Sequence, residues 1–271
     1  MSYEPPALFV AWRDPETRRI YAVGRLLRLV GTFRGYEFGY IEGARVATEV
    51  GFQPFLAFPK LDQVYRSREL LPFFQNRVLS PARPDYPEYV ESLALDAGVA
   101  EPLTLLAVSG GRRATDLVEI FPDWTLEGTG ERIQTRLLVR GVQHVPGAEE
   151  RIARLQSGEA LHGVRDRENP INPQAIRLRT EDGIDIGFVP DYLAADLTRL
   201  LDNGAEIDVR VQRVNPPPVP RHHRVLCVLS TRAGVGVAGY RGETFRPISS
   251  DATDIEDRVT TPAPPAVVAG L

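Results

Sequence analysis

The sequence predicts an α+β protein in which a small antiparallel sheet with helices is followed by a second, strand-rich part. Residues 8–12, 20–29 and 35–41 carry the apolar and aromatic runs typical of strands, and Asp14-Pro15 breaks the first pair as a hairpin turn would. In residues 191–202 the leucines are spaced as on one face of a helix, with a proline before this run and Asn-Gly after it. The 271 residues allow one or two domains, and we expect two.

The composition is that of an ordinary globular protein, with 43% hydrophobic and 25% charged residues. Because we find no apolar run long enough to cross a bilayer and no charged-then-apolar leader after Met1, we expect a cytoplasmic protein without a membrane partner. Cys227, the only cysteine, lies in an apolar run and is expected to be buried rather than nucleophilic. A formal net charge of −4 argues against nonspecific coating of nucleic acid but allows a local basic face.

The first part continues with helices. Residues 66–79 and 86–97 place apolar side chains close to helical spacing, which predicts two short helices after the sheet. Residues 103–108 are expected to form a helix or a strand, and residues 117–121 a strand. The polar, glycine-rich stretch that follows predicts a linker at 123–133.

The second part alternates strands with turns. Residues 137–142 and 160–165 are expected to be strands, with a short helix at 149–157 between them. Four further strands are expected at 175–178, 184–189, 206–214 and 224–229. After Thr231 the composition turns to glycine, alanine, proline and threonine, so we expect a flexible tail over 233–271.

The loop at 168–173 contains two Asn-Pro pairs, which makes it stiffer than a plain connection requires and suits it to present atoms to a ligand. The motifs in and around it are Arg165, Asn169-Pro170, Ala175-Ile176, Ile186-Gly187-Phe188-Val189-Pro190 and the helix at 191–201. Together they resemble a HIRAN domain over residues 134–231. The resemblance implies a small β-barrel with two short helices, which we place at 134–232, and a DNA partner. The best-studied members hold the 3′ end of single-stranded DNA.

The first part carries motifs of its own. They are Val23-Gly24-Arg25-Leu26, Arg68-x-x-x-Pro72-Phe73-Phe74-x-Asn76 and Gly110-Gly111-Arg112. Over residues 7–122 they resemble the N-terminal subdomain of HipA-type toxin kinases, and we therefore place such a domain at 1–122. The resemblance implies a lid-like module that contacts protein partners.

A kinase core is not expected with it. Lys60, the only lysine, follows Phe58-Pro59 rather than a glycine-rich loop, and nothing similar to the His-Arg-Asp catalytic loop follows. Residues 109–113 lack the spacing of a P-loop and are better explained as a hairpin turn.

The HIRAN resemblance implies a binding pocket made by the residues after the first strand and by the loop around Asn169. The predicted nucleic-acid-binding residues are Gln143, His144, Arg165, Arg167, Asn169, Ile171, Asn172, Arg210 and Arg213. The better-studied members have arginine and tyrosine where this chain has Gln143-His144. Tyrosine and aspartate usually stand where it has Ile171 and Asn172, so capture of a 3′ end is left open. Asn169 could equally cap the turn before Pro170. The arginines of the late strands could form a basic groove or a solvated face.

No metal, cofactor or enzymatic activity is expected. His222, His223 and Cys227 have no second pair at zinc-site spacing, and no Ser/His/Asp set or carboxylate pair is marked by its context. The leading hypothesis is a bacterial, non-enzymatic DNA-binding protein that engages single-stranded or end-bearing DNA in repair or in defence against foreign DNA. The alternative is a protein–protein adaptor in a toxin–antitoxin or regulatory complex.

Overall fold

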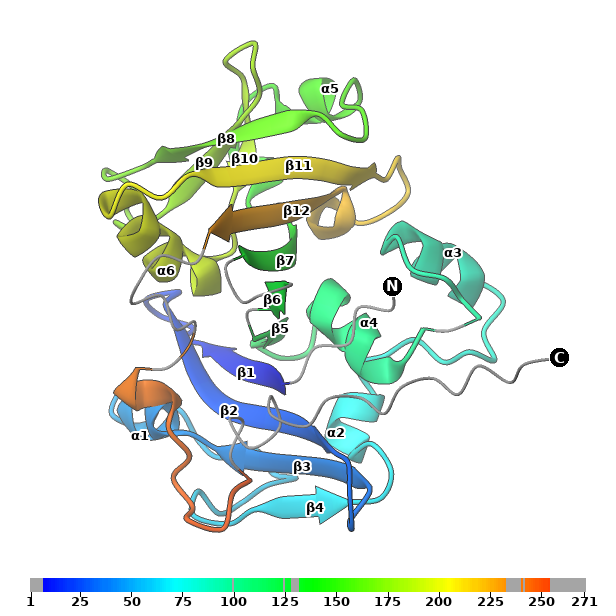
Figure 1. Cartoon of the computed structure of the whole chain (residues 1–271), viewed down its shortest axis with the longest axis vertical. Helices are drawn as coiled ribbons and strands as arrows, with labels where there is room; N and C mark the ends of the chain where they lie inside the picture. The colour runs from blue at the N-terminus through cyan, green and yellow to red at the C-terminus, as the bar shows by residue number, and fades with distance from the viewer. Residues whose placement is uncertain are drawn as a thin grey trace, which may run out of the picture.

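The computed structural model of the chain describes residues 7–98, 100–123, 125–127, 132–232, 240 and 242–253. It mixes α-helices with two antiparallel sheets, one of five strands and one of seven (Figure 1). The strand orders are β4-β3-β2-β1-β5 and β10-β9-β8-β11-β12-β7-β6. None of the helices in the described ranges combines the length and the apolar composition needed to cross a bilayer.

The five-stranded sheet is built from the first part of the chain. Its strands are β1 (Ala7–Arg13), β2 (Ile20–Leu29), β3 (Gly35–Tyr40), β4 (Tyr65–Ser67) and β5 (Val118–Pro122). The helices around it are α1 (Glu42–Thr48), α2 (Pro72–Gln75), α3 (Tyr86–Ser92) and α4 (Pro102–Ser109). The three predicted N-terminal strands and the strand before the linker are confirmed, and residues 103–108 form a helix.

Two details of this part differ from the prediction. The helix expected over residues 66–79 is only the single turn α2, because Pro72 at its first position cannot lie inside a helix that begins earlier. Residues 65–67 instead pair with β3 as a short strand. Helix α1 was not predicted: it follows a strand directly, and Ile41 at its N-cap offers no capping side chain.

The seven-stranded sheet is built from the second part. Its strands are β6 (Thr125–Glu127), β7 (Arg132–Leu138), β8 (Ala160–Arg165), β9 (Ile176–Arg179), β10 (Asp185–Phe188), β11 (Ile207–Val214) and β12 (Val225–Arg232). Between them lie the α-helices α5 (Ala148–Ile152) and α6 (Asp191–Asp202) and the 3₁₀-helices η1 (Val142–His144) and η2 (Arg221–His223). Helix α6 has the predicted bounds. The predicted linker differs, since residues 125–127 pair with 132–134 as a hairpin through backbone bonds that a polar composition does not reveal.

The seven-stranded sheet curls until the end of β10 meets the residues that follow β7, which gives the sheet a barrel-like form. Arg140, just after β7, and Phe188, at the end of β10, exchange two backbone hydrogen bonds of 2.9 and 2.8 Å. Two glycines make this approach possible. A Cβ on Gly187 would lie 2.6 Å from the carbonyl oxygen of Arg140, and one on Gly141 would lie 2.9 Å from the Phe188 ring. Both glycines also have positive φ angles. We call this closure the seam.

The two sheets share one hydrophobic core. Phe9 of β1 and Phe121 of β5 belong to the same buried cluster as Leu161 and Leu193 of the second part. Phe121 also stacks on Tyr192 of α6 with ring centroids 4.5 Å apart. Burial of such aromatic groups gives both parts a common source of stability.

Residues 242–253, which we call the C-terminal segment, return to the first sheet. In Figure 1 this segment runs beside α1. Ile248 donates to the carbonyl of Tyr40 at 3.0 Å, and the buried carboxylate of Glu37 accepts from the backbone and hydroxyl of Thr253, both at 2.8 Å. Phe245 in the 3₁₀-helix η3 (Glu243–Phe245) packs edge-on to Phe9. A flexible tail was predicted here, but the segment is held mostly by backbone hydrogen bonds, which the composition does not reveal. Residues 233–239, 241 and 254–271 of the predicted tail lie outside the described residues.

Candidate nucleic-acid interface

A cleft of about 630 Å³ lies where the seam faces the first sheet. Its charged lining residues are Arg13, Arg18, Arg112, Arg140, Arg221, Glu119 and Asp191. Five arginines against two carboxylates make the cleft positive, although the formal net charge of the chain is −4. Arginines gathered in one hollow create a positive potential there, which attracts phosphate groups.

The seam itself places one wall of the cleft. Arg140 leaves the sheet there, and Gly141, in a left-handed conformation, starts the 3₁₀-turn that carries Gln143 and His144 to the lining. Val142 in the same turn is buried and anchors it. The amide nitrogen of Gln143 lies 3.1 Å from Nε2 of His144, so the two side chains form one polar edge.

The loop predicted to present atoms to a ligand forms a second wall. Oδ1 of Asn169 accepts hydrogen bonds from the backbone N–H groups of Ile171 and Asn172, both at 3.1 Å, and its amide donates to Asp166 at 3.2 Å. Asn169 therefore shapes the turn, as the structural alternative expected. Ile171 is 44% exposed and lines the cleft, which leaves an apolar side chain available to pack against a flat ligand group.

Asn172 is occupied by its own neighbours. Its amide donates to Asp191 at 3.4 Å, and its Oδ1 accepts from the backbone of Gln174 at 2.9 Å. The carboxylate that lines the cleft close to this loop is that of Asp191, at the first position of α6.

Two ion pairs join the walls across the cleft. Arg140 pairs with Glu119 of β5 and also donates to the carbonyl of His222 at 3.1 Å. Arg13 of β1 lies 3.4 Å from Asp191. Burial opposes ionisation of Glu119, but the charges of Arg140 and Arg112 outweigh it and hold the pKa of this carboxyl below its ordinary value. Glu119 is therefore a carboxylate at neutral pH and fixes Arg140 beside the cleft.

Arg18 and Arg112 differ from the other arginines of the cleft. Both are exposed, and neither guanidinium forms a hydrogen bond or ion pair with any residue in the part of the chain that the structure describes. Partial burial of its guanidinium lowers the pKa of Arg112; the charge of Glu119 opposes that effect and the charge of Arg140 adds to it.

The two neighbouring histidines carry no charge at neutral pH. Burial lowers the pKa of His222 to about 4, with Arg140 adding to the effect, and burial together with His222 lowers the pKa of His223 to about 4. His222 lines the cleft and therefore offers a neutral ring to a ligand.

The structure brings only some of the predicted site residues together. Gln143, His144, Asn169 and Ile171 line the cleft, and Asn172 lies on the same loop. The other predicted residues lie outside the lining. Arg165 pairs with Asp202, Arg167 is exposed on the loop, Arg210 lies 3.1 Å from Asp208, and Arg213 lies 3.0 Å from Glu91.

Sequence reasoning missed Arg13, Arg18 and Arg140, and it set aside residues 109–113, which include Arg112, as a hairpin turn, whereas they connect α4 to β5. Local patterns do not show that the β1–β2 turn and the residues after α4 face the seam. The described residues contain no group of three or more His, Cys, Asp or Glu side chains that could hold a metal. Cys227 is buried, and burial raises the pKa of its thiol.

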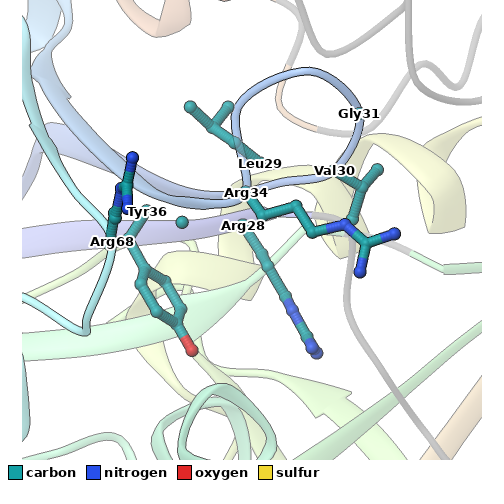
Figure 2. Close-up of a pocket in the computed structure, with 8 residues that line it drawn as sticks. Arg28, Leu29, Val30, Gly31, Arg34, Tyr36 and Arg68 are labelled. Atoms are coloured by element: carbon teal, nitrogen blue, oxygen red, sulfur yellow. The ribbon is translucent and has the colours of Figure 1, made fainter.

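A second hollow, of about 280 Å³, lies at the β2–β3 hairpin and is lined by Arg28, Arg34, Tyr36 and Arg68. Figure 2 shows that the three guanidinium groups point away from one another. Arg28 also lies 3.9 Å from Glu101. This hollow is positive but does not direct its charges to one point.

Comparisons with known proteins identify part of the chain. The family model of the HIRAN domain matches residues 134–231. The crystal structure of the HIRAN domain of human HLTF is 21% identical and covers 39% of this chain and 80% of that chain, with a TM-score of 0.29. A crystal structure of a Lactobacillus plantarum protein is 17% identical, covering 37% and 99% at a TM-score of 0.31. The NMR structure of the HLTF HIRAN domain in its DNA-bound conformation is 19% identical, covering 42% and 81% at a TM-score of 0.27. No curated protein matches the chain.

Proposed function

Because residues 134–231 match the HIRAN domain, we propose that this protein binds DNA, single-stranded or end-bearing, in the cleft at the seam, and that it does so without catalysing a reaction. The observation that carries the proposal is the charge of the cleft. Five arginines line it together with Gln143, His144 and Ile171, which are residues that the HIRAN resemblance assigned to DNA binding.

The cleft offers the two kinds of contact that a single strand uses. Guanidinium groups bind backbone phosphates, and flat or apolar side chains pack against bases. Here the neutral ring of His222, the ring of Phe188 and the exposed Ile171 supply the second kind. Asp191 is the carboxylate that can accept a hydrogen bond from a terminal sugar hydroxyl, because Asn172 is already held by its neighbours.

The first part adds a second candidate function, contact with a protein partner through the HipA-like module. It is favoured by the tip of the β2–β3 hairpin, where Val30 is 69% exposed and Phe33 is 39% exposed. Exposed apolar side chains on a hairpin tip are suited to a protein interface. In that case the chain would act as an adaptor in a toxin–antitoxin or regulatory complex, without binding DNA itself.

The test is fluorescence-anisotropy binding at low salt to three matched oligonucleotides. They are a single strand with a free 3′ hydroxyl, the same strand with a 3′ phosphate, and a blunt duplex. Preference for the free hydroxyl indicates end recognition, and equal binding to both single strands indicates a groove that follows the backbone. Absence of binding to all three at low salt, where the electrostatic contribution is largest, would contradict DNA binding and favour the protein-partner function.

A further inference from the structure

Arg18 is held at the edge of the cleft by a rigid turn. The carboxylate of Asp14 accepts from the backbone of Glu16 at 3.0 Å, and the Arg18 backbone donates to the Asp14 carbonyl at 3.0 Å. Arg18 adopts a left-handed conformation with φ of +63°, and its carbonyl accepts from Arg13 at 2.9 Å. The backbone of Arg18 is thus fixed, while its guanidinium makes no hydrogen bond or ion pair with the residues that the structure describes.

Arg112 is anchored on the backbone side as well. The preceding Gly111 donates to the hydroxyl of Ser109 at 3.2 Å, and its carbonyl accepts from the buried Arg77 at 3.1 Å. A Cβ on Gly111 would lie 2.9 Å from Leu106, so this turn packs closely against α4. Arg112 follows directly and extends from a fixed point.

Both residues line the same space. Arg18 and Arg112 line the cleft and also a smaller adjoining hollow of about 40 Å³, together with Arg13 and Glu119. The remaining arginines of the cleft are committed to carboxylates: Arg140 to Glu119, Arg13 to Asp191, and Arg221 to Glu149 at 2.7 Å. Within the described part of the chain, the two arginines of the cleft that form no ion pair with a carboxylate therefore line the same side of it.

We propose that Arg18 and Arg112 form a phosphate-binding subsite for the backbone of a nucleic-acid strand, supplied by the part of the chain outside the HIRAN domain. The inference rests on the proposed function and extends it to a second wall of the cleft. Two cations held near each other repel, and a phosphodiester between them removes that repulsion while its oxygens accept charge-assisted hydrogen bonds. The planar guanidinium matches the phosphate oxygens in two-point contact.

The experiment compares two double variants of the full chain. R18Q/R112Q removes the subsite. R34Q/R68Q is the matched control: Arg34 and Arg68 belong to the same part, are exposed, and have guanidinium groups without hydrogen bonds or ion pairs to the described residues (Figure 2). They lie at the far end of β2, about 30 Å from the start of that strand at ~3.3 Å per residue. Both variants lower the positive charge equally.

The readout is the dissociation constant for a single-stranded oligonucleotide between about 50 and 200 mM salt. Each lost phosphate contact lowers the salt slope by about 0.7, and the subsite holds one phosphate, so R18Q/R112Q should lose about 0.7 from its slope. Over this fourfold range of salt the wild type should lose about 2.6-fold more affinity than R18Q/R112Q does. The control should keep the wild-type slope, and R18K/R112K, which retains the charge, should keep most of it.

The outcomes separate the two proposals. A wild-type chain that does not bind DNA contradicts the proposed function. A wild-type chain that binds, with R18Q/R112Q keeping the wild-type slope, overturns the subsite and leaves the proposed function standing. An equal loss of slope in R34Q/R68Q also overturns the subsite, because the effect would then come from overall charge.

Discussion

Replacement of Glu119 by glutamine should lower stability and raise DNA affinity together. Glu119 is only 6% exposed, pairs with Arg140 from the other sheet and lines the cleft. Removing one partner of a fully buried ion pair costs about 3–5 kcal/mol. Arg140 keeps its bond to the His222 carbonyl and reaches an open cleft, so we expect a loss of about 2 kcal/mol, which lowers Tm by about 4–8 °C.

The gain in affinity follows from the charge that the substitution removes. A phosphate about 7 Å from this carboxylate is repelled by about 0.6 kcal/mol in water and by about 2.4 kcal/mol at an effective dielectric constant of about 20. We take about 1 kcal/mol, which is about fivefold tighter binding of single-stranded DNA by E119Q. A residue that only supported the fold would give the opposite sign, because a less stable cleft binds more weakly.

The assay pairs thermal unfolding with anisotropy titration, and E91Q is the control. Glu91 is also an arginine partner, of Arg213, but it is exposed and does not line the cleft. Weaker DNA binding by E119Q, or an unchanged Tm, would refute the reasoning. The pKa of Glu119 is lowered in the folded state, so its contribution to stability is present above the unfolded value of about 4.3 and is lost as pH falls through the folded value. E119Q should lack this acid loss.

Two further predictions concern the seam and the histidines. Gly187→Ala should lower the free energy of unfolding by about 3 kcal/mol, because its Cβ would meet the backbone of Arg140. Gly183→Ala has a positive φ but nothing within 4 Å of its Cβ, so it should lower the free energy of unfolding by about 1–2 kcal/mol. Denaturant unfolding compares the two variants, and equal losses would contradict the steric argument. The pKa values of His222 and His223 are about 4 in the folded protein and about 6.5 when unfolded, so stability should fall as pH falls from about 6.5 to 4, by up to about 1.4 kcal/mol per pH unit for each. His223→Gln should reduce that slope, and an unchanged slope would exclude this histidine as a cause.

The parts of the fold that could be predicted are those with strong local signals. Helix α6 has a proline before it, Asn203-Gly204 after it and leucines on one face, and its bounds match the prediction. The β6–β7 hairpin and the C-terminal segment were missed because backbone hydrogen bonds hold them, and these leave little trace in composition.

The candidate site divides in the same way. Gln143, His144, Asn169 and Ile171 came from motifs near the seam. The arginines of the first part did not, because only the shared core brings residue 18 near residue 140. Arg210 and Arg213 lie on a well-predicted strand, yet Arg210 pairs with its neighbour Asp208 and Arg213 pairs with Glu91 of α3, and neither lines the cleft.

The C-terminal segment also has a consequence for synthesis. The first sheet leaves the ribosome before residues 134–231, whereas Thr253, which satisfies the buried carboxylate of Glu37, is made after both. At about 5–20 residues per second, synthesis of the chain between Glu37 and Thr253 takes on the order of ten seconds or more. During that time Phe9 lacks the aromatic cover of Phe245, so the first sheet is without part of its apolar packing. The first part to be made is thus the last to be completed.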